Sequence, residues 1–312
     1  MLISVIIPCF NEQEVINESY RRLVNVFIDH NLPDYELIFV NDGSRDKTMF
    51  LLREIASTNE HVKLLSFSRN FGHQAAVTAG LKECKGDVAI IIDADLQDPP
   101  EVIPEMLKVF NDEQCNVVYG VRNHRKGESF MKLFTAKMFY RLLNSLSDIS
   151  FPVDTGDFRL VDRKVINAFN NLSEKNKYIR GLISWLGFKQ CPVYYNRDAR
   201  FAGETKYPFR KMLKFASIGL FYFSKKPLKI ATSLGFLSVF AGLMYVIYIL
   251  ISMIFGFGHV VSGWTSTIVL IIFFGGVQLL TIGVLGQYIG SLFDEVKNRP
   301  EYIIADKLNF NE

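Results

Sequence analysis

Two aspartates separated by one residue, Asp93 and Asp95, follow an apolar run of the chain and precede Pro99-Pro100. Carboxylates at positions i and i+2 that leave a strand can share one hard divalent cation, and Gln97 offers a neutral oxygen close by. Mg²⁺ in proteins is usually held by one or two carboxylates together with the phosphates of a substrate. The pattern predicts a Mg²⁺ or Mn²⁺ site for a phosphorylated substrate, although such a pair alone is a weak signal.

Three other polar motifs also follow apolar runs. Each one by itself is explained at least as well by a turn or a helix cap, where Asn, Asp, Gly and Ser are preferred. Together with the aspartate pair, they favour a shared binding edge over four unrelated turns. The three motifs are Pro8-Cys9-Phe10-Asn11-Glu12, Asn41-Asp42-Gly43-Ser44 and Ser68-Arg69-Asn70-Phe71-Gly72.

The elements that must position these motifs alternate along the first 120 residues as apolar runs and amphipathic stretches. Runs that are almost wholly apolar are typical of strands covered on both faces, and the βαβα order predicts a mostly parallel, doubly wound sheet. Ligands of such sheets bind at the carboxyl ends of the strands, where the motifs lie. We expect strands at Ile3–Ile7, Tyr35–Val40, Val62–Phe67, Asp87–Ile92 and Asn116–Tyr119, and helices at Glu14–Asp29, Lys47–Ser57, His73–Lys82 and Pro100–Asn111.

Two common nucleotide-binding classes are disfavoured by missing motifs. No GxGxxG follows the first expected strand, and no GxxxxGK[ST] occurs in the chain. These glycine-rich loops hold phosphates in dinucleotide dehydrogenases and P-loop NTPases. The aspartate pair is therefore the main phosphate-related feature of the domain.

The charged residues are distributed unevenly along the 312-residue chain. The 35 Lys and Arg and 32 Asp and Glu give a net charge of +3, yet the 64 residues from Ile230 to Phe293 contain none of them. About 20 apolar residues already span a bilayer as a helix, so this run is long enough for two spans. We expect them at Ile230–Phe255 and about Ser266–Ile289. A purely soluble protein is excluded, and 27 Phe and 13 Tyr exclude a disordered one.

Basic residues flank the charge-free run and are absent from the loop between the expected spans. By the positive-inside rule, the polar domain and the C-terminus face the cytoplasm. Four dispersed cysteines, which we expect to be unpaired thiols, fit a reducing compartment. The basic residues are Lys225, Lys226 and Lys229 before the first span and Lys297 and Arg299 after the second; the cysteines are Cys9, Cys84, Cys115 and Cys191.

The segment before the first span, residues 200–229, contains eight Lys and Arg and one Glu, interleaved with Phe and other apolar residues. This composition is typical of amphipathic helices in an anionic headgroup region. A nucleic-acid-binding patch is the alternative, and it is disfavoured because the segment leads directly into a span. The expected organisation is a cytosolic domain at 1–199, basic juxtamembrane helices at 200–229, a two-helix transmembrane hairpin at 230–293 and a cytosolic tail at 294–312.

The order of these motifs resembles glycosyltransferase family 2, and within it the polyprenyl-phosphate glycosyltransferases, such as bactoprenol glucosyltransferases and dolichyl-phosphate mannose synthases. The resemblance covers nearly the whole chain, both expected spans included. It implies a GT-A fold, which is a Rossmann-like α/β domain with a mostly parallel sheet, followed by two C-terminal transmembrane helices. Beyond the four motifs above, it rests on Tyr119-Gly120-Val121-Arg122, Asp154-Thr155-Gly156-Asp157-Phe158-Arg159, Arg200-Phe201-Ala202-Gly203-Glu204-Thr205-Lys206 and Gly286-Gln287-Tyr288-Ile289-Gly290.

The resemblance also implies roles for particular residues. Asp95 and Asp157 would be catalytic, and Asp93, Asp95 and Gln97 would hold Mg²⁺ or Mn²⁺ on the diphosphate. The nucleotide-sugar would contact Pro8, Phe10, Glu12, Asp42, Ser44, Arg69, Asn70, Asp93 and Ala94. The acceptor phosphate would face Arg122, Arg200 and Lys206, and a guanidinium group suits phosphate because it can bind two oxygens at once. Lys132, after Arg122 in the chain, could extend this site, and a solvated helix face is an equal alternative for it.

Asp157 matches the catalytic acid–base position of the family. An alcohol acceptor would need a general base, but the second pKa of a phosphate monoester is about 6, so a lipid phosphate is largely dianionic at neutral pH. Our hypothesis is that Asp157 orients the acceptor or the sugar more than it removes a proton. The alternative for Asp157 is a surface turn carboxylate.

The implied activity is the inverting transfer of one sugar, glucose or N-acetylglucosamine, from a UDP-linked donor to undecaprenyl or another polyprenyl phosphate. The QxxRW signature of processive polysaccharide synthases is absent, which favours single transfer. The implied setting is the bacterial cytoplasmic (inner) membrane, with a separate flippase and a downstream transferase for cell-envelope glycosylation. No nucleic-acid partner is implied, and a homo-oligomer is compatible with the resemblance.

Two alternatives come from other classes of protein. A metal-dependent phosphohydrolase of the haloacid type would need DxDxT after its first strand, whereas Gln97 occupies the Thr position and the motif follows the fourth strand. A non-catalytic membrane scaffold would predict broken motifs, whereas Asp93, Asp95 and Asp157 are all present.

Overall fold

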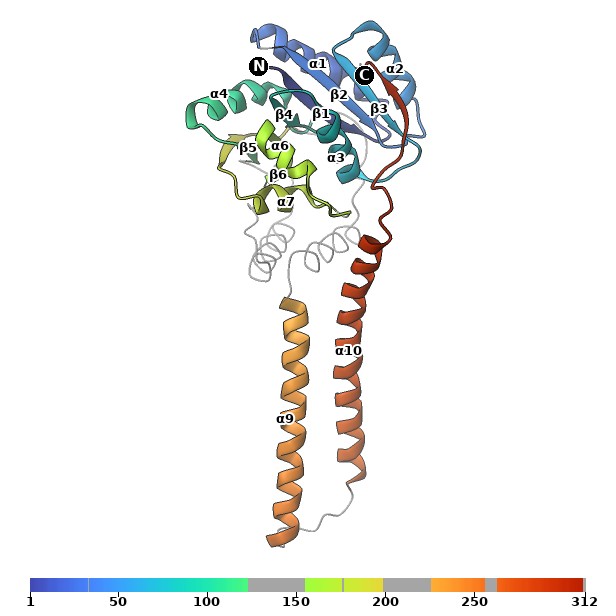
Figure 1. Ribbon diagram of the computed structural model, residues 1–312, viewed down its shortest axis with the longest axis vertical. Helices are drawn as coiled ribbons and strands as arrows, with labels where there is room; N and C mark the ends of the chain where they lie inside the picture. The colour runs from blue at the N-terminus through green and yellow to red at the C-terminus, as the bar shows by residue number, and fades with distance from the viewer. Residues whose placement is uncertain (33, 123–154, 176, 199–225, 256–262, 311–312) are drawn as a thin grey trace. The chain divides into compact units, whose positions relative to one another are not determined.

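The computed structural model describes residues 1–32, 34–122, 155–175, 177–198, 226–255 and 263–310. The chain divides into two compact units. One unit holds the α/β elements together with the C-terminal residues from Asn298 onward, and the other holds two long helices (Figure 1). The predicted Lys132, Arg200 and Lys206, and the juxtamembrane residues 200–225, lie outside the described residues.

The α/β unit is built on one eight-stranded sheet (Figure 1). Its strands are β1 (Ile3–Cys9), β2 (Tyr35–Asn41), β3 (Val62–Phe67), β4 (Val88–Ile91), β5 (Val117–Arg122), β6 (Thr155–Asp162), β7 (Gln190–Tyr195) and β8 (Ile304–Leu308). Their spatial order is β7-β5-β6-β4-β1-β2-β3-β8. β1 pairs in parallel with β2 and β4, β2 with β3, and β5 with β7, while β6 and β8 run antiparallel to their neighbours. The mostly parallel sheet predicted from the sequence is confirmed.

All five expected strands and four expected helices are present. β1 and β5 continue two and three residues beyond the predicted ends, because the apolar pattern stops before the pairing does. The sequence did not predict β6, β7 or β8, or the two short helices between β6 and β7. The helices of this unit are α1 (Ile16–Asp29), α2 (Thr48–Thr58), α3 (His73–Glu83), a 3-10 turn at Pro100–Val102 with α4 (Ile103–Glu113), α6 (Arg163–Asn170) and α7 (Ile179–Trp185).

Helices cover both faces of the sheet, which is why every residue of β1 and β4 is buried. Alternate residues of β1, such as Ile3 and Val5, join a core with apolar residues of α1, α2 and α4. On the opposite face α3 approaches so closely that a Cβ on Gly80 would lie 2.3 Å from a methyl carbon of Ile6. The glycine therefore sets the distance between α3 and the strand whose end carries the first polar motif.

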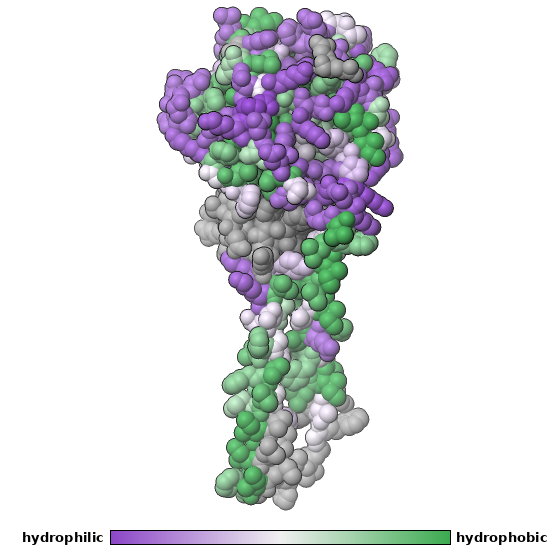
Figure 2. Space-filling view, viewed as in Figure 1, coloured by the Kyte–Doolittle hydropathy of each residue, from purple (hydrophilic) through white to green (hydrophobic). Residues whose placement is uncertain are grey.

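The second unit consists of α9 (Lys226–Phe255) and α10 (Trp264–Val296), which lie side by side (Figure 1). Lys226–Tyr245 and Leu270–Val296 are long and apolar enough to cross a membrane. Large apolar side chains along both helices are exposed, and Figure 2 shows apolar residues along this pair where the α/β unit shows polar ones. Exposed apolar side chains are unfavourable in water and favourable in a lipid bilayer. The length and composition of these helices therefore indicate association with a membrane.

Two features of the α/β unit differ from the sequence-based expectations. Cys115 and Cys191 form a disulfide with their Cα atoms 6.2 Å apart, so the expectation of four unpaired thiols is wrong for this pair. Their sequence separation of 76 concealed that β5 and β7 are adjacent strands. The C-terminal segment is more than a tail, because it supplies the edge strand β8, in which Leu308 lies opposite Leu64.

Candidate active site

The polar motifs meet at one edge of the sheet because of the strand directions. The carboxyl ends of β1, β2, β3 and β4 point to this edge, as do those of β5 and β7. β6 runs the other way, so its beginning lies at the same edge, and Asp157 is its third residue. The antiparallel insertion of β6 thus brings Asp157 to the loops that follow the parallel strands.

The loops after β1 and β2 are joined by hydrogen bonds. The amide of Asn11 donates to Ser44 Oγ at 3.0 Å, and the amide of Glu12 donates to Thr48 Oγ1 at 2.8 Å. Asn11 adopts a left-handed conformation with φ 54°, which Asn tolerates better than most residues. Pro8 and Ala94 are buried, whereas Phe10, Glu12 and Ser44 are half-buried. The structure therefore brings together the predicted nucleotide residues of these two loops.

Asp42 fixes the loop that follows β3. Its carboxylate is buried and accepts hydrogen bonds from the amides of Phe71 at 2.7 Å and Gly72 at 2.9 Å. The side chain of Asn70 donates to the same carboxylate at 2.8 Å. Burial raises the pKa of Asp42, and the two backbone donors oppose that rise. Asp42 thus holds in place the turn from which α3 begins.

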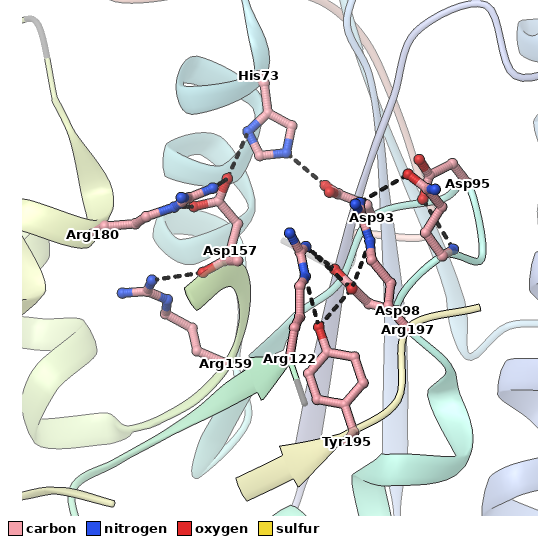
Figure 3. Close-up of polar contacts among 12 residues, drawn as sticks. His73, Asp93, Asp95, Asp98, Arg122, Asp157, Arg159, Arg180, Tyr195 and Arg197 are labelled. Atoms are coloured by element: carbon pink, nitrogen blue, oxygen red, sulfur yellow. Dashed lines mark hydrogen bonds and ion pairs between the residues drawn. The ribbon is translucent and has the colours of Figure 1, made fainter. Parts of the chain in front are cut away.

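His73, the first residue of α3, lies between two carboxylates (Figure 3). Its Nε2 is 2.8 Å from Asp93 Oδ1, and its Nδ1 is 3.8 Å from Asp157 Oδ2. Burial alone would lower the pKa of His73, but Asp93 and Asp157 raise it to about 9. Burial alone would raise the pKa of Asp93, but the imidazole of His73 holds that pKa below its usual value. The imidazole of His73 therefore lies between the predicted metal ligand and the predicted catalytic residue.

Arg180 binds Asp157 from the other side (Figure 3). Its Nε lies 2.6 Å from Oδ1 and its Nη2 lies 3.0 Å from Oδ2, a bidentate pair. The position of Arg180 is set by Gln74, which follows His73 and accepts a hydrogen bond from the amide of Ile179 at 2.9 Å. Burial alone would raise the pKa of the Asp157 carboxyl, but Arg180 and, more weakly, His73 hold it well below its usual range. A carboxylate in this state is a poor proton acceptor.

A second polar cluster lies around Asp98, a residue whose sequence context suggests a turn and a helix cap. Its side chain is 1% exposed. The carboxylate accepts hydrogen bonds from Arg122 Nη2 at 3.0 Å and from the hydroxyl of Tyr195 at 2.5 Å (Figure 3). Gly156 makes room for this pair, since a Cβ there would lie 2.5 Å from Arg122 Nη2. Arg122 therefore joins β5 to the aspartate loop, and a phosphate at Arg122 would have to share its guanidinium group with Asp98.

The loop after β4 presents Asp93 and Asp95 as half-buried carboxylates. Between Asp95 and Gln97, Leu96 is buried in a left-handed conformation with φ 57°, which is strained for a non-glycine residue and is held by the surrounding structure. The amide of Gln97 donates to Asp95 Oδ1 at 3.1 Å, and its side-chain oxygen accepts from Arg197 Nη2 at 2.8 Å. These two hydrogen bonds tie Gln97 to Asp95 on one side and to Arg197 on the other.

The carboxylates of this loop suit a divalent cation in their chemistry. Within the described ranges, no group of three or more His, Cys, Asp and Glu is arranged around a common metal position. Two carboxylates from one loop nevertheless suit Mg²⁺ or Mn²⁺, because these ions commonly take their remaining ligands from substrate phosphates and water. The donor chemistry therefore fits, with Asp93 and Asp95 as protein ligands, while Asp93 Oδ1 is engaged by His73 and the oxygen of Gln97 by Arg197.

Sequence reasoning missed several residues that the structure brings to the site. His73 directly follows the motif Ser68–Gly72 after the third strand, but nothing in the sequence indicates two carboxylate partners. Arg180 follows no recognisable motif, and Tyr195 and Arg197 lie on or after a strand that was not predicted. The missed residues share one property, which is a charged or polar partner distant in sequence: His73, Asp98, Arg180, Tyr195 and Arg197.

Comparison with known proteins agrees with this fold. Residues 4–169 match the family model described as glycosyl transferase family 2. The chain is 50% identical over 301 residues to the uncharacterized glycosyltransferase YkcC of Bacillus subtilis, covering 96% of this chain and 92% of that protein. It is 40% identical over 304 residues to the SfII prophage-derived bactoprenol glucosyl transferase of Shigella flexneri, covering 97% of each.

Among solved structures, glucosyl-3-phosphoglycerate synthase from Mycobacterium tuberculosis has a similar fold. The TM-score is 0.50 at 20% identity, and the match covers 70% of this chain and 76% of that one. The α/β unit therefore has the GT-A fold expected from the sequence. The chain belongs to glycosyltransferase family 2, and it is a glycosyltransferase.

Proposed function

We propose that this enzyme transfers a single sugar from a UDP-linked donor, glucose or N-acetylglucosamine, to undecaprenyl or another polyprenyl phosphate. The observation that carries the proposal is the 40% identity to a bactoprenol glucosyl transferase along 97% of both chains. That similarity includes the two apolar helices as well as the α/β unit, so it extends to the part that a lipid acceptor would require.

The state of Asp157 supports a phosphate acceptor. Arg180 occupies both oxygens of Asp157 and holds its pKa well below the usual range, so Asp157 is a poor general base. An alcohol acceptor must lose a proton during transfer, whereas a phosphate dianion need not. In this mechanism an acceptor phosphate oxygen attacks the anomeric carbon as the bond from that carbon to the nucleoside diphosphate breaks. The leaving diphosphate takes the bonding electron pair, and the anomeric configuration inverts.

We assign the binding roles on the same basis. The nucleoside would lie against the joined loops after β1, β2 and β3, which carry Phe10, Glu12, Asp42, Ser44, Arg69 and Asn70. Asp93 and Asp95 would hold a divalent cation, whose chemistry is to stabilise negative charge on the departing diphosphate. Asp157, fixed between Arg180 and His73, would orient the sugar or the acceptor, and Arg122, Lys132, Arg200 and Lys206 stay predicted contacts of the acceptor phosphate.

The proposed location is the bacterial cytoplasmic membrane, with α9 and α10 as the transmembrane hairpin and the α/β unit and C-terminus in the cytosol. Support comes from the length of both helices and from the basic residues that flank the charge-free run 230–293, such as Lys229 and Lys297. The lipid-linked sugar would then require a separate flippase and a second transferase before it reached the cell envelope.

The experiment that tests the proposal uses the full chain purified in detergent with a panel of nucleotide sugars. Nucleoside diphosphate release is measured with and without undecaprenyl phosphate. Release that depends on both lipid and donor supports the proposal. Release of inorganic phosphate from phosphorylated compounds without sugar transfer would favour a phosphohydrolase, and inactivity with every donor and lipid would favour a scaffold.

A further inference from the structure

The C-terminal residues that follow α10 are built into the α/β unit at several points. Arg53 pairs with Asp306 at 2.6 Å, and the side-chain amide of Asn309 donates to the carbonyl of Ala56 at 2.6 Å, near the end of α2. β8 covers the outer edge of β3, and an exposed strand edge is an aggregation hazard, so edge protection alone would explain this pairing. It does not explain the contacts made just before β8.

Tyr302 lies against the strand end that leads into the active-site loop. Its ring stacks on Phe67 with centroids 5.0 Å apart, and Phe67 in turn meets Phe71 edge-on at 5.8 Å. The amide of Ser68 donates to the carbonyl of Ile303 at 3.0 Å. Phe71 is the residue whose amide binds Asp42, two positions before His73. The tail thus supports the loop 68–72 from which His73 reaches Asp93 and Asp157.

Glu301, the preceding residue, contacts the second segment that shapes the site. Its carboxylate pairs with Lys177 Nζ at 3.1 Å, and the two side chains are only 15% and 7% exposed. Lys177 stands three residues before Arg180, which holds Asp157 in a bidentate pair. Tyr302 and Glu301 therefore contact the two segments that carry His73 and Arg180. These two side chains lie on either side of the Asp157 carboxylate.

We propose that Glu301 and Tyr302 are positioning residues for sugar transfer, which set His73 and Arg180 against Asp157 through the loop 68–72 and the segment 177–180. The second apolar helix ends at Val296, so these residues follow it within six positions. The chain that leaves the helix pair is therefore part of the support of the active site. The kinetic consequence rests on the proposed donor site, whereas the positioning itself does not.

The test compares two tail variants with two matched controls, all in the full chain. Tyr302→Ala removes the ring beside Phe67, and Phe310→Ala removes a ring from the same tail that lies instead near Lys63 and Lys307. Glu301→Gln removes the charge paired with Lys177, and Asp306→Asn removes one paired with Arg53 on α2. Tyr302→Phe keeps the ring and serves as the rescue.

Hydrogen exchange of the peptide that contains Phe71 and Gly72 is measured without substrate. Tyr302→Ala should speed exchange of these amides by about tenfold, while Tyr302→Phe and Phe310→Ala should leave them within about twofold of the parent chain. If alanine prevents folding, Tyr302→Leu keeps apolar bulk without the stacking and carries the same expectation. Unchanged exchange in the folded variant would overturn the positioning of this loop by Tyr302.

Steady-state sugar transfer gives the second readout. Tyr302→Ala and Glu301→Gln should each lower kcat/KM for the donor by about tenfold and change the acceptor KM by less than about twofold, and both controls should stay near the parent values. Losses as large in Phe310→Ala and Asp306→Asn would show general tail stabilisation and overturn the proposal. If the parent chain transfers no sugar from any UDP donor, the proposed function fails, and the exchange experiment still decides the positioning role.

Discussion

Arg180 engages both carboxylate oxygens of Asp157, with Nε 2.6 Å from Oδ1 and Nη2 3.0 Å from Oδ2. The pair joins a residue near the start of α7 to one near the start of β6, and His73 Nδ1 lies 3.8 Å from Asp157 Oδ2. A carboxylate with these partners is an anion throughout the neutral range. It is well suited to hold a group in position and poorly suited to take a proton from one.

Replacing Arg180 by Gln separates these two roles. The change would raise the pKa of Asp157 towards its ordinary value and so make it a stronger base, while loosening its orientation. We expect kcat to fall by about tenfold or more, equivalent to at least about 1.4 kcal/mol of transition-state stabilisation. Arg180→Lys, which keeps the charge, should lose less. A Gln variant that matched or exceeded the parent kcat would contradict the orienting role.

The pH dependence of Asp157→Asn tests the same point independently. Because the pKa of Asp157 lies well below its usual range, the parent residue does not titrate near neutrality, and the acceptor phosphate affects both enzymes equally. We expect residual transfer by Asp157→Asn and a ratio of parent to variant rates that stays constant between about pH 6 and about pH 7.5, a range below the pKa of about 9 to which Asp93 and Asp157 raise His73. A variant that binds acceptor normally yet stays inactive at alkaline pH would instead indicate proton abstraction.

Gly156→Ala should disturb the cluster around Asp98. A Cβ at this position would lie 2.5 Å from Arg122 Nη2 and 3.5 Å from Asp98 Oδ2, so the buried ion pair must move. We expect a loss of about 1–3 kcal/mol in stability, as for other overpacked sites, together with lower activity. Thermal unfolding in detergent provides the measurement, and Gly283→Ala, where a Cβ meets nothing within 4 Å, is the control. Equal unfolding temperatures for both variants would argue against the crowding.

Glu36 gives the α/β unit an acid-sensitive contribution to stability. It is buried and accepts hydrogen bonds from Lys63, from Ser4 Oγ at 2.5 Å and from the amide of Lys85 at 2.7 Å. Burial alone would raise its pKa, but the Lys63 and Ser4 bonds lower it below the ordinary value of about 4.3. The contribution of Glu36 to folding stability is therefore complete when the pH is above its ordinary, unfolded-state pKa. It is lost as the pH falls through the lower pKa of the folded state.

We expect Glu36→Gln to destabilise the unit by about 1–3 kcal/mol at neutral pH and to flatten the fall in stability on acidification. Unfolding midpoints of the parent and Glu36→Gln chains, measured at intervals from about pH 7 to about pH 3, provide the check. Parallel curves for the two proteins would show that Glu36 does not contribute to the pH dependence.

Removal of divalent cations should stop sugar transfer. If Asp93 and Asp95 hold the cation on the diphosphate, then chelation followed by dialysis abolishes activity, and added Mg²⁺ or Mn²⁺ restores it. Asp95→Asn should lower kcat by about a hundredfold or more, since a charge contact to the departing group is lost. Full activity in the chelated enzyme would rule out this role for the aspartate pair.

The sequence predicted those parts of the fold that local patterns determine. The strands from Ile3 to Tyr119 were found because fully buried strands leave uninterrupted apolar runs, and the apolar helices were found because charge is excluded from them. β7 was missed because Pro192 and the exposed Tyr194 interrupt its pattern, and β8 because a short edge strand alternates without a marked apolar run.

The site was predicted to a similar extent and for a similar reason. Motifs after parallel strands can be placed at one edge by topology alone, so Asp42 and Asp95 were assigned to it from the sequence. The ion pair of Asp157 with Arg180 could not be predicted in this way. It depends on the antiparallel strand β6 and on the start of α7, where the amide of Ile179 donates to Gln74. Contacts between distant charged residues leave no periodic signal in a single sequence.

The most direct test of the central claim is identification of the lipid product. The purified chain is supplied with labelled UDP-glucose or UDP-N-acetylglucosamine, Mg²⁺ or Mn²⁺, and either undecaprenyl phosphate or the alcohol undecaprenol. We predict a labelled lipid carrying one sugar with the phosphate and none with the alcohol, because Asp157, whose pKa Arg180 and His73 hold well below its usual range, is a poor base for the alcohol proton. A labelled product from undecaprenol, or nucleotide release at the same rate without any lipid, would contradict it.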